Sequence, residues 1–193
     1  MALAAMTAAC VPFGASSETR TTSSSRAAAP WTASWGAAVQ PAHADPSEPE
    51  GNWSESGFGE ETLRQVVRLS VGGPKLRVRL SNAYGTRPLK IAGATVARSD
   101  GGAKARPGTL LPLTFGGSPA TTVPVGKDIT TDEVPLPTTH REELVVSLRF
   151  AAPTGRATVH RFTTATSYRA PGDHLWSTAS ESFDRSATPP GTT

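Results

Sequence analysis

Side chains that commonly do chemistry are few in this chain of 193 residues, and they lie far apart in sequence. The four histidines are His43, His140, His160 and His174, and no two of them have the spacing of metal ligands. Cys10 is the single cysteine, which excludes an intrachain disulfide. The sequence therefore predicts neither a metal site nor a cofactor.

Motifs for nucleophilic catalysis and phosphate binding are also missing. The chain has no Gly-x-Ser-x-Gly nucleophile elbow, no phosphate loop and no Gly-x-Gly-x-x-Gly. The most suggestive short piece is PGDH, residues 171–174, which a turn on Gly172 and Asp173 explains without chemistry. A Ser–His–Asp set assembled from distant residues stays open, because spacing alone does not exclude it. No residue is assigned as catalytic.

Aromatic side chains offer the clearest candidates for ligand contact. Trp53, Tyr84 and Trp176 fall in predicted loops or strand ends, where residues that stack on sugars often lie. Capping of the open ends of a sandwich is the favoured interpretation of these residues, and contact with a sugar is the alternative. Trp31 and Trp35 are spaced to share one face of a helix or strand, and we expect them to anchor the first segment of the domain. A sugar platform is the alternative for this pair.

These candidates must be positioned by strands, because 18 glycines and 17 prolines interrupt any long helix. Apolar residues alternate in residues 62–71 and 75–81, and the Gly-Gly-Pro between them predicts a hairpin. About eight short antiparallel strands at this spacing indicate an all-β fold, a β-sandwich of jelly-roll type. The remaining strands are predicted in LKIAGATVAR (89–98), GTLLPLTF (108–115), ATTVPV (120–125), DEVPLP (132–137), ELVVSLRF (143–150) and ATVHRFTTATSY (157–168).

Charge is segregated along the chain. Residues 43–61 contain six acids and no Lys or Arg, whereas residues 62–106 contain ten Lys or Arg and one acid. Arg64, Arg68, Arg77 and Arg79 are predicted on the solvated side of their strands; a domain interface or a polyanion-binding face are the alternatives. The acidic leader and the lack of aromatics on that face argue against a nucleic-acid partner.

The two ends differ in composition from the middle. Residues 1–30 comprise an apolar segment typical of an export signal and a low-complexity linker; residues 31–184 form the predicted sandwich, and residues 185–193 a disordered tail. Although no Lys or Arg precedes the apolar segment, we expect a secreted protein. An Ala-rich tail, or a lipid anchor on Cys10, are the alternatives. No stretch is long enough to predict a transmembrane helix.

Several stretches together resemble one family. The longest is GFGEETLRQVVRLSVGGPKLRVRLSNAYGTRPLKIAGATVAR at residues 57–98; WTASWGAAVQP precedes it, and PGTLLPLTFGG, LVVSLRF and TTATSYRAPGDH follow. With these stretches the chain resembles the N-terminal β-domain of secreted SGNH/GDSL hydrolases, which are esterases of the lysophospholipase and lipase type. The resemblance covers roughly residues 31–184.

The resemblance implies a partner more than an activity. In this family a catalytic domain follows the β-domain and carries a Gly-Asp-Ser block with the nucleophile and an Asp-x-x-His block. Neither block occurs here, since Gly172 and Asp173 are followed by His174. The resemblance therefore implies a truncated ester hydrolase, represented by an accessory domain that packs against an SGNH catalytic domain and is inactive alone. The alternative is a stand-alone module that binds polysaccharide or the cell envelope.

Overall fold

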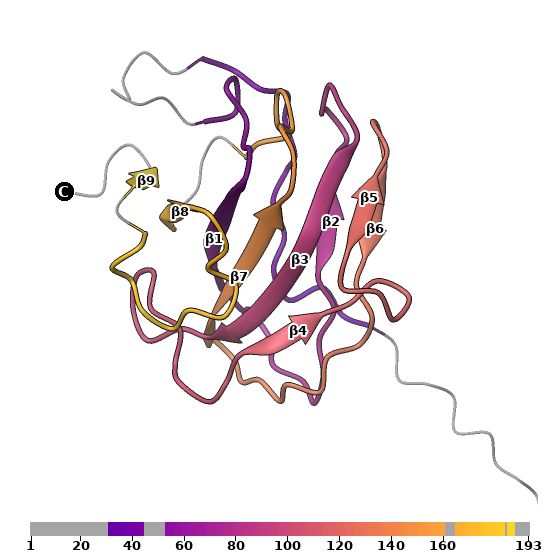
Figure 1. The fold of residues 1–193 in the computed structure, drawn as a ribbon. Coiled ribbons are helices and arrows are strands. Elements are labelled where there is room, and N and C mark those ends of the chain that lie inside the picture. Colours follow the sequence, from indigo (N-terminus) through magenta and orange to yellow (C-terminus); the bar gives the residue numbers. More distant parts are fainter. Residues whose placement is uncertain (1–30, 45–52, 161–164, 184, 188–193) are drawn as a thin grey trace, which may run out of the picture. The chain divides into compact units, whose positions relative to one another are not determined.

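The computed structural model describes residues 31–44, 53–160, 165–183 and 185–187. The chain divides into two units, Met1–Thr32 and Ala33–Thr193, and all strands lie in the second (Figure 1). The described residues contain no helix, so the all-β prediction is confirmed. The signal-like segment, the linker and residues 188–193 fall outside the described residues. The strands are β1 (Glu61–Arg68), β2 (Arg79–Ser81), β3 (Leu89–Arg98), β4 (Leu111–Leu113), β5 (Thr121–Val123), β6 (Asp128–Thr130), β7 (Glu143–Phe150), β8 (Ser167–Pro171) and β9 (Arg185–Ala187).

Seven strands form one antiparallel sheet in the order β4-β3-β7-β1-β8-β9, and β5 shares the outer edge of β3 with β4. The central strand β7 is buried on both faces. Its Leu144, Val146, Leu148 and Phe150 face the main core, while Ser147, on the other face, is also buried. A sheet buried on both faces needs a cover on each side.

The cover on the core side is a two-stranded sheet, β2 with β6. Pairing continues beyond β2 through bridges from Gly73 to Thr138 and from Leu76 to Val134. The predicted hairpin between residues 62–71 and 75–81 is therefore wrong. Both edges of β1 are occupied, by β7 and β8, so the chain after Gly72 crosses to the other layer instead of folding back.

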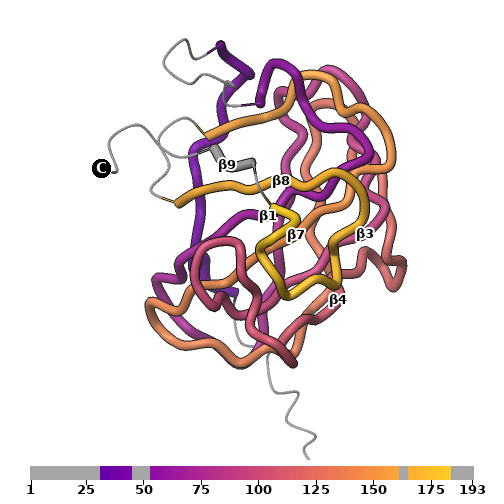
Figure 2. The backbone as a smooth tube through the Cα atoms, turned by 60° about the vertical axis from the view of Figure 1, so that its left-hand side comes forward, coloured from indigo at the N-terminus to yellow at the C-terminus, as the bar shows by residue number. Residues whose placement is uncertain are grey.

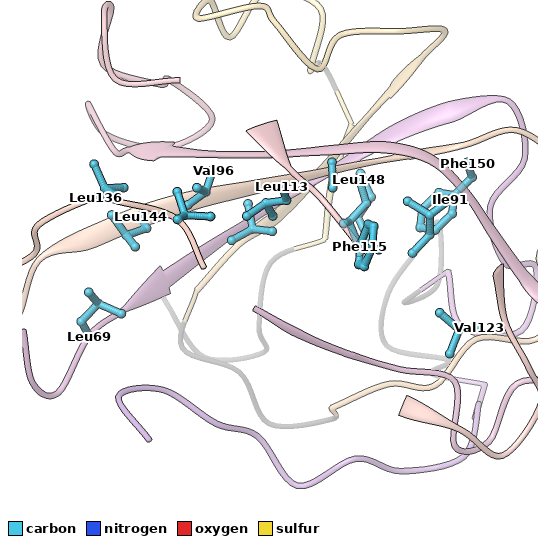
Figure 3. Packing of buried hydrophobic residues seen from close by; sticks show 14 of the residues in the cluster. Leu69, Ile91, Val96, Leu113, Phe115, Val123, Leu136, Leu144, Leu148 and Phe150 are labelled. Atoms are coloured by element: carbon cyan, nitrogen blue, oxygen red, sulfur yellow. The ribbon is translucent and has the colours of Figure 1, made fainter. Parts of the chain in front are cut away.

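The main core lies between these layers (Figure 3). Phe150 stacks on Phe58 with ring centroids 5.2 Å apart. Burial of each large apolar side chain contributes about 1.5–3 kcal/mol, which makes this core the main stabilising feature. Fully or nearly fully buried members include Leu63, Ile91, Val96, Leu113, Phe115, Val123, Leu144, Val146 and Leu148; Leu76, Val78 and Leu80 pack on them from the second layer, as their alternation predicts.

The structure confirms some of the other predicted strands and corrects others. β3 and β7 match their predicted ranges, 89–98 and 143–150, and β4 and β5 lie inside theirs. The stretch 132–137 contributes one bridge through Val134, because β6 precedes it. Val159 pairs with Gln40, and β8 begins only at Ser167. β9 pairs with β8, so the sheet extends into the tail that was predicted from residue 185.

Candidate functional site

The most elaborate polar cluster of the described residues surrounds Arg64 on β1. The Arg64 side chain is completely buried, although the sequence predicts it on a solvated face. It projects from the face opposite to the core, because its neighbour Leu63 faces the core. Residues 172–183, called here the C-terminal segment, run across this face and cover it (Figure 2).

All five N–H donors of the Arg64 guanidinium have an acceptor. The acceptors come from β7, from the loop after β3 and from the C-terminal segment, so one side chain joins three parts of the chain. Nε donates to Ser147 Oγ at 2.9 Å; Nη1 donates to the carbonyl oxygens of Ala103 (2.8 Å) and Ala179 (3.4 Å); and Nη2 donates to those of His174 (3.2 Å) and Ser177 (2.8 Å).

This cation is buried without a carboxylate partner among the described residues. Desolvation lowers the pKa of Arg64 to about 10, so the guanidinium is protonated at neutral pH. Main-chain carbonyl dipoles and the ring of Phe183, whose centroid lies 4.0 Å from Cζ, replace its water. With every donor used and no exposed surface, Arg64 offers nothing to a ligand and serves to hold the C-terminal segment.

Two buried threonines extend this attachment. Thr62 Oγ1 donates to Gly172 O at 2.8 Å and accepts from His174 N at 3.0 Å. Thr95 Oγ1 donates to Leu175 O at 3.0 Å from the neighbouring part of the sheet. We call Thr62, Arg64, Thr95 and Ser147 the Arg64 cluster. Thr62, Arg64 and Thr95 bind main-chain atoms of the C-terminal segment, and Ser147 supports them by accepting from Arg64 Nε.

A glycine lets the C-terminal segment approach the sheet. Leu175 is buried over β3, and a Cβ added at Gly93 would lie 2.7 Å from Leu175 Cδ1. The pairing of β3 with β7 shifts register between Ile91 and Gly93. A glycine inside a strand signals such a close approach, but the sequence does not say which segment comes near.

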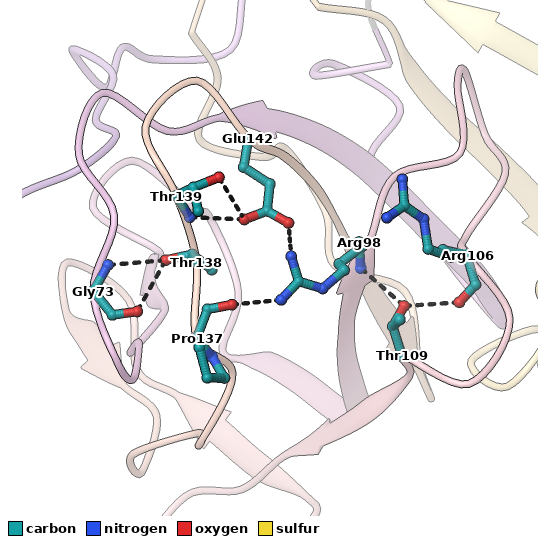
Figure 4. A network of polar contacts seen from close by, with 8 residues as sticks. All are labelled: Gly73, Arg98, Arg106, Thr109, Pro137, Thr138, Thr139 and Glu142. Carbon is teal, nitrogen blue, oxygen red and sulfur yellow. Dashed lines mark hydrogen bonds and ion pairs between the residues drawn. The ribbon is translucent and has the colours of Figure 1, made fainter.

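A second polar network closes one end of the sheet (Figure 4). Arg98, at the end of β3, pairs with Glu142 and donates from Nη2 to Pro137 O at 2.5 Å. Glu142 also accepts from Thr139 N at 2.8 Å. Thr109 Oγ1 accepts from Arg98 N at 3.1 Å. These contacts fix loops to the sheet and leave no convergent set of free donors, so the network is structural.

The three aromatic candidates for ligand contact have different positions. Trp53 is 4% exposed, packs edge-on to Phe58 and lies under the guanidinium of Arg169, so its ring is closed to a ligand. Tyr84 is 46% exposed in the loop after β2, and Trp176 is 61% exposed in the C-terminal segment. They lie in two different loops.

Trp35 departs from its prediction as an anchor, because 54% of it is exposed. It lines a hollow of about 320 Å³ together with Ala33, Ser34, Gly36, Arg68 and Ser70. Both tryptophans predicted to anchor the first segment are exposed, since Trp31 is 47% exposed. The Trp35 ring is therefore accessible from solvent.

The histidines show no catalytic pairing in the contacts of three rings. The ring nitrogens lie near main-chain oxygens: His140 Nδ1 at 2.6 Å from Ser70 O, His160 Nδ1 at 3.0 Å from Ala38 O, and His174 Nε2 at 2.9 Å from Pro171 O. Asp173 caps the turn that carries His174 by accepting from Leu175 N at 3.1 Å. Among the described residues no group of three His, Cys, Asp or Glu could hold a metal ion.

Arginines of the basic stretch are partly neutralised. Lys75 and Arg77 both pair with Glu133, and Arg79 lies 3.6 Å from Asp128. The lysine and arginine contacts lower the pKa of Glu133, with the hydrogen bond from Lys75 as the largest cause. These exposed pairs lie between β2 with its extension and the facing chain of the second layer, and each contributes little to stability.

No model of a known protein family matches this chain, and no curated protein sequence matches it either. The relationship to SGNH hydrolases therefore stays a prediction. The described part of the chain contains no helix that is long and apolar enough to cross a membrane.

Proposed function

We propose that this chain is a non-catalytic accessory β-domain that serves a secreted SGNH-type ester hydrolase. One observation carries the proposal: the most elaborate polar cluster of the described residues, around Arg64, is saturated by main-chain acceptors. A catalytic cluster keeps donors or a nucleophile available to a substrate. A saturated one acts as scaffold.

The path of the chain after the Arg64 cluster suits an accessory role. The Arg64 cluster fixes the C-terminal segment, and β9 follows that segment and returns to the edge of the sheet beside β8. The described chain therefore ends on a strand that is hydrogen-bonded to the sheet. In the family that the sequence resembles, the catalytic domain is connected after this region.

Ester hydrolysis tests the first half of the proposal. The purified chain is expected to cleave p-nitrophenyl butyrate no faster than buffer and to resist labelling by a serine-directed fluorophosphonate. Turnover that the fluorophosphonate abolishes would contradict the proposal.

The accessory role needs a second measurement. An SGNH catalytic domain is fused after residue 193, and its thermal midpoint and esterase rate are compared with those of the same domain fused to an unrelated β-sandwich. The accessory domain is expected to raise the midpoint by several degrees, because it covers apolar surface of its partner. Equal midpoints in the two fusions would refute the accessory role.

A further inference from the structure

The hollow beside Trp35 is open, mixed in chemistry and unused by the proposed function. We propose that it is a binding subsite for an acidic saccharide, a pyranose ring that carries a carboxylate. The inference requires no catalytic domain, and it stands or falls separately from the accessory role.

Trp35 is held in place by its neighbour. Ser34 forms four hydrogen bonds with the chain just after β1: Ser70 N and Oγ donate to Ser34 O at 2.8 and 2.6 Å, Ser34 Oγ donates to Val71 O at 2.5 Å, and Val71 N donates to Ser34 Oγ at 3.3 Å. On its other side Gln40 pairs with Val159 through N–O distances of 2.7 and 3.0 Å. The exposed ring is therefore presented by a backbone that is anchored on both sides.

Open space lies directly beside the ring. A Cβ added at Gly36 would meet no heavy atom within 4 Å. The hollow of about 320 Å³ is shallow and open to solvent, so a sugar ring would lie on it with one face exposed. The flat apolar face of an indole packs well against the C–H face of a pyranose, and its N–H remains available to a hydroxyl group.

Arg68 gives the hollow its charge preference. Arg68 ends β1 with its side chain exposed, and it forms no ion pair with a carboxylate of the described residues. Its opposite residue on β7 is Glu143, while His140 and Arg141 stand on the adjoining turn, where His140 contacts Ser70 O and Arg141 N donates to Leu69 O. An exposed guanidinium that forms no ion pair can bind the carboxylate of a ligand with two parallel hydrogen bonds.

The lining favours a sugar over an apolar protein surface. Half of the six lining residues are Ser34, Arg68 and Ser70, which are polar, and Trp35 is the single large apolar one. A hydroxylated ring with one negative charge satisfies the indole face and the guanidinium together. An apolar protein anchor would leave Arg68 desolvated and unpaired, which is costly.

Calorimetric titration of the full chain with oligogalacturonate and oligomannuronate at low ionic strength tests this subsite. Binding is expected for at least one of the two, and full methyl esterification of that ligand should weaken binding at least about tenfold, because it removes the carboxylate but keeps the ring. Trp35→Ala and Arg68→Gln should each weaken binding at least about tenfold. Binding to neither ligand, or equal binding to the esterified form, would overturn the proposal.

Two further sets of variants separate the hollow from the rest of the surface. Gly36→Phe fills the hollow and should abolish binding, whereas Gly36→Ala should leave it unchanged. Trp176→Ala and Arg79→Gln alter an exposed tryptophan and an exposed arginine elsewhere, and both should bind as the wild type does.

Poly-glutamate serves as a sugar-free polyanion; if it binds as tightly as the uronate, the saccharide assignment is wrong. Urea unfolding of every variant confirms that the fold is intact, and a loss of affinity in a variant with an unchanged midpoint is counted as support.

Discussion

Arg64 and Ser147 stand directly opposite each other on β1 and β7, and the arginine Nε donates to the serine Oγ at 2.9 Å. This cross-strand bond sets the guanidinium at the angle from which its two other nitrogens reach four carbonyl oxygens. This cross-strand pair thus fixes three carbonyl oxygens of a segment more than 100 residues away in the chain, since His174 lies 110 positions from Arg64.

Replacement of Arg64 by leucine is expected to lower the free energy of unfolding by about 3 kcal/mol or more, because several buried carbonyl oxygens lose their donor at once. Arg64→Lys should lose less, since lysine keeps the charge but has three donors. Urea unfolding monitored by circular dichroism measures both. Arg79→Leu, at an exposed position, should stay within about 0.5 kcal/mol of the wild type. A similarly small change for Arg64→Leu would contradict the assigned role.

Thr62→Val preserves shape but removes both hydrogen bonds of the Thr62 hydroxyl group to the C-terminal segment. We expect a loss of about 1–2 kcal/mol in the free energy of unfolding. The backbone amide of His174 should also exchange with solvent faster, which NMR hydrogen exchange can measure. The control is Thr122→Val, an exposed threonine on β5; if the two variants are equally stable, the hydroxyl group does not hold the segment.

Acid should weaken the turn at residues 114–118. Hydrogen bonds from Gly117 N, Thr114 Oγ1 and Gly116 N lower the pKa of Asp132, with that from Gly117 the largest cause. A carboxyl group with a lower pKa in the folded state contributes stability above its unfolded pKa, and this contribution is lost as pH falls through the folded pKa. Asp132→Asn should therefore show a smaller drop in urea midpoint between pH 6 and pH 2 than the wild type. The comparison variant is Asp100→Asn, an exposed aspartate outside this turn. If the urea midpoint of Asp132→Asn drops between pH 6 and pH 2 as much as that of the wild type, the prediction is refuted.

Two glycines with similar backbones should respond differently to alanine. Gly57 and Gly116 have φ angles of 66° and 61°, which cost a side chain about 1–2 kcal/mol each. A Cβ at Gly57 would also lie 1.9 Å from Gly155 O, whereas one at Gly116 meets nothing within 4 Å. Gly57→Ala should thus lose about 3 kcal/mol or more and Gly116→Ala about 1 kcal/mol. Equal losses in thermal or urea unfolding would show that the chain relaxes around Gly57.

Alternation in the sequence predicts the faces of β7 over its whole length, whereas on β3 the register shift after Ile91 changes the phase, so that Ile91 and then Ala94 and Val96 face the main core. It does not predict whether the polar face is wet. Arg64 and Arg68 are the same residue type on the same face of β1, yet Arg64 is buried and Arg68 is exposed. The difference comes from a cover that is remote in sequence, and no local pattern reports such a cover.

The hairpin error has a similar physical origin. Gly72, Gly73 and Pro74 permit a sharp change of direction, and that property serves a hairpin and a crossing between layers equally well. A hairpin is excluded here because β8 pairs with the edge of β1 where the partner strand of a hairpin would lie. For the candidate subsite, the sequence identifies Trp35 as a contact residue only as an alternative, because its exposure depends on where Ser34 pairs with Ser70 and Val71.

The C-terminal segment is anchored through its carbonyl oxygens and amide hydrogens, which every residue type except proline supplies alike. Leu175 and Phe183 are the side chains of the segment that are buried beneath it. Exposed positions such as 176 take no part in these contacts, so they can change identity while the path of the chain stays the same. The exposed positions of this segment can therefore be substituted while its main-chain hydrogen bonds are kept. New side-chain chemistry can be displayed there, by evolution or by design, without a change in the strands beneath it.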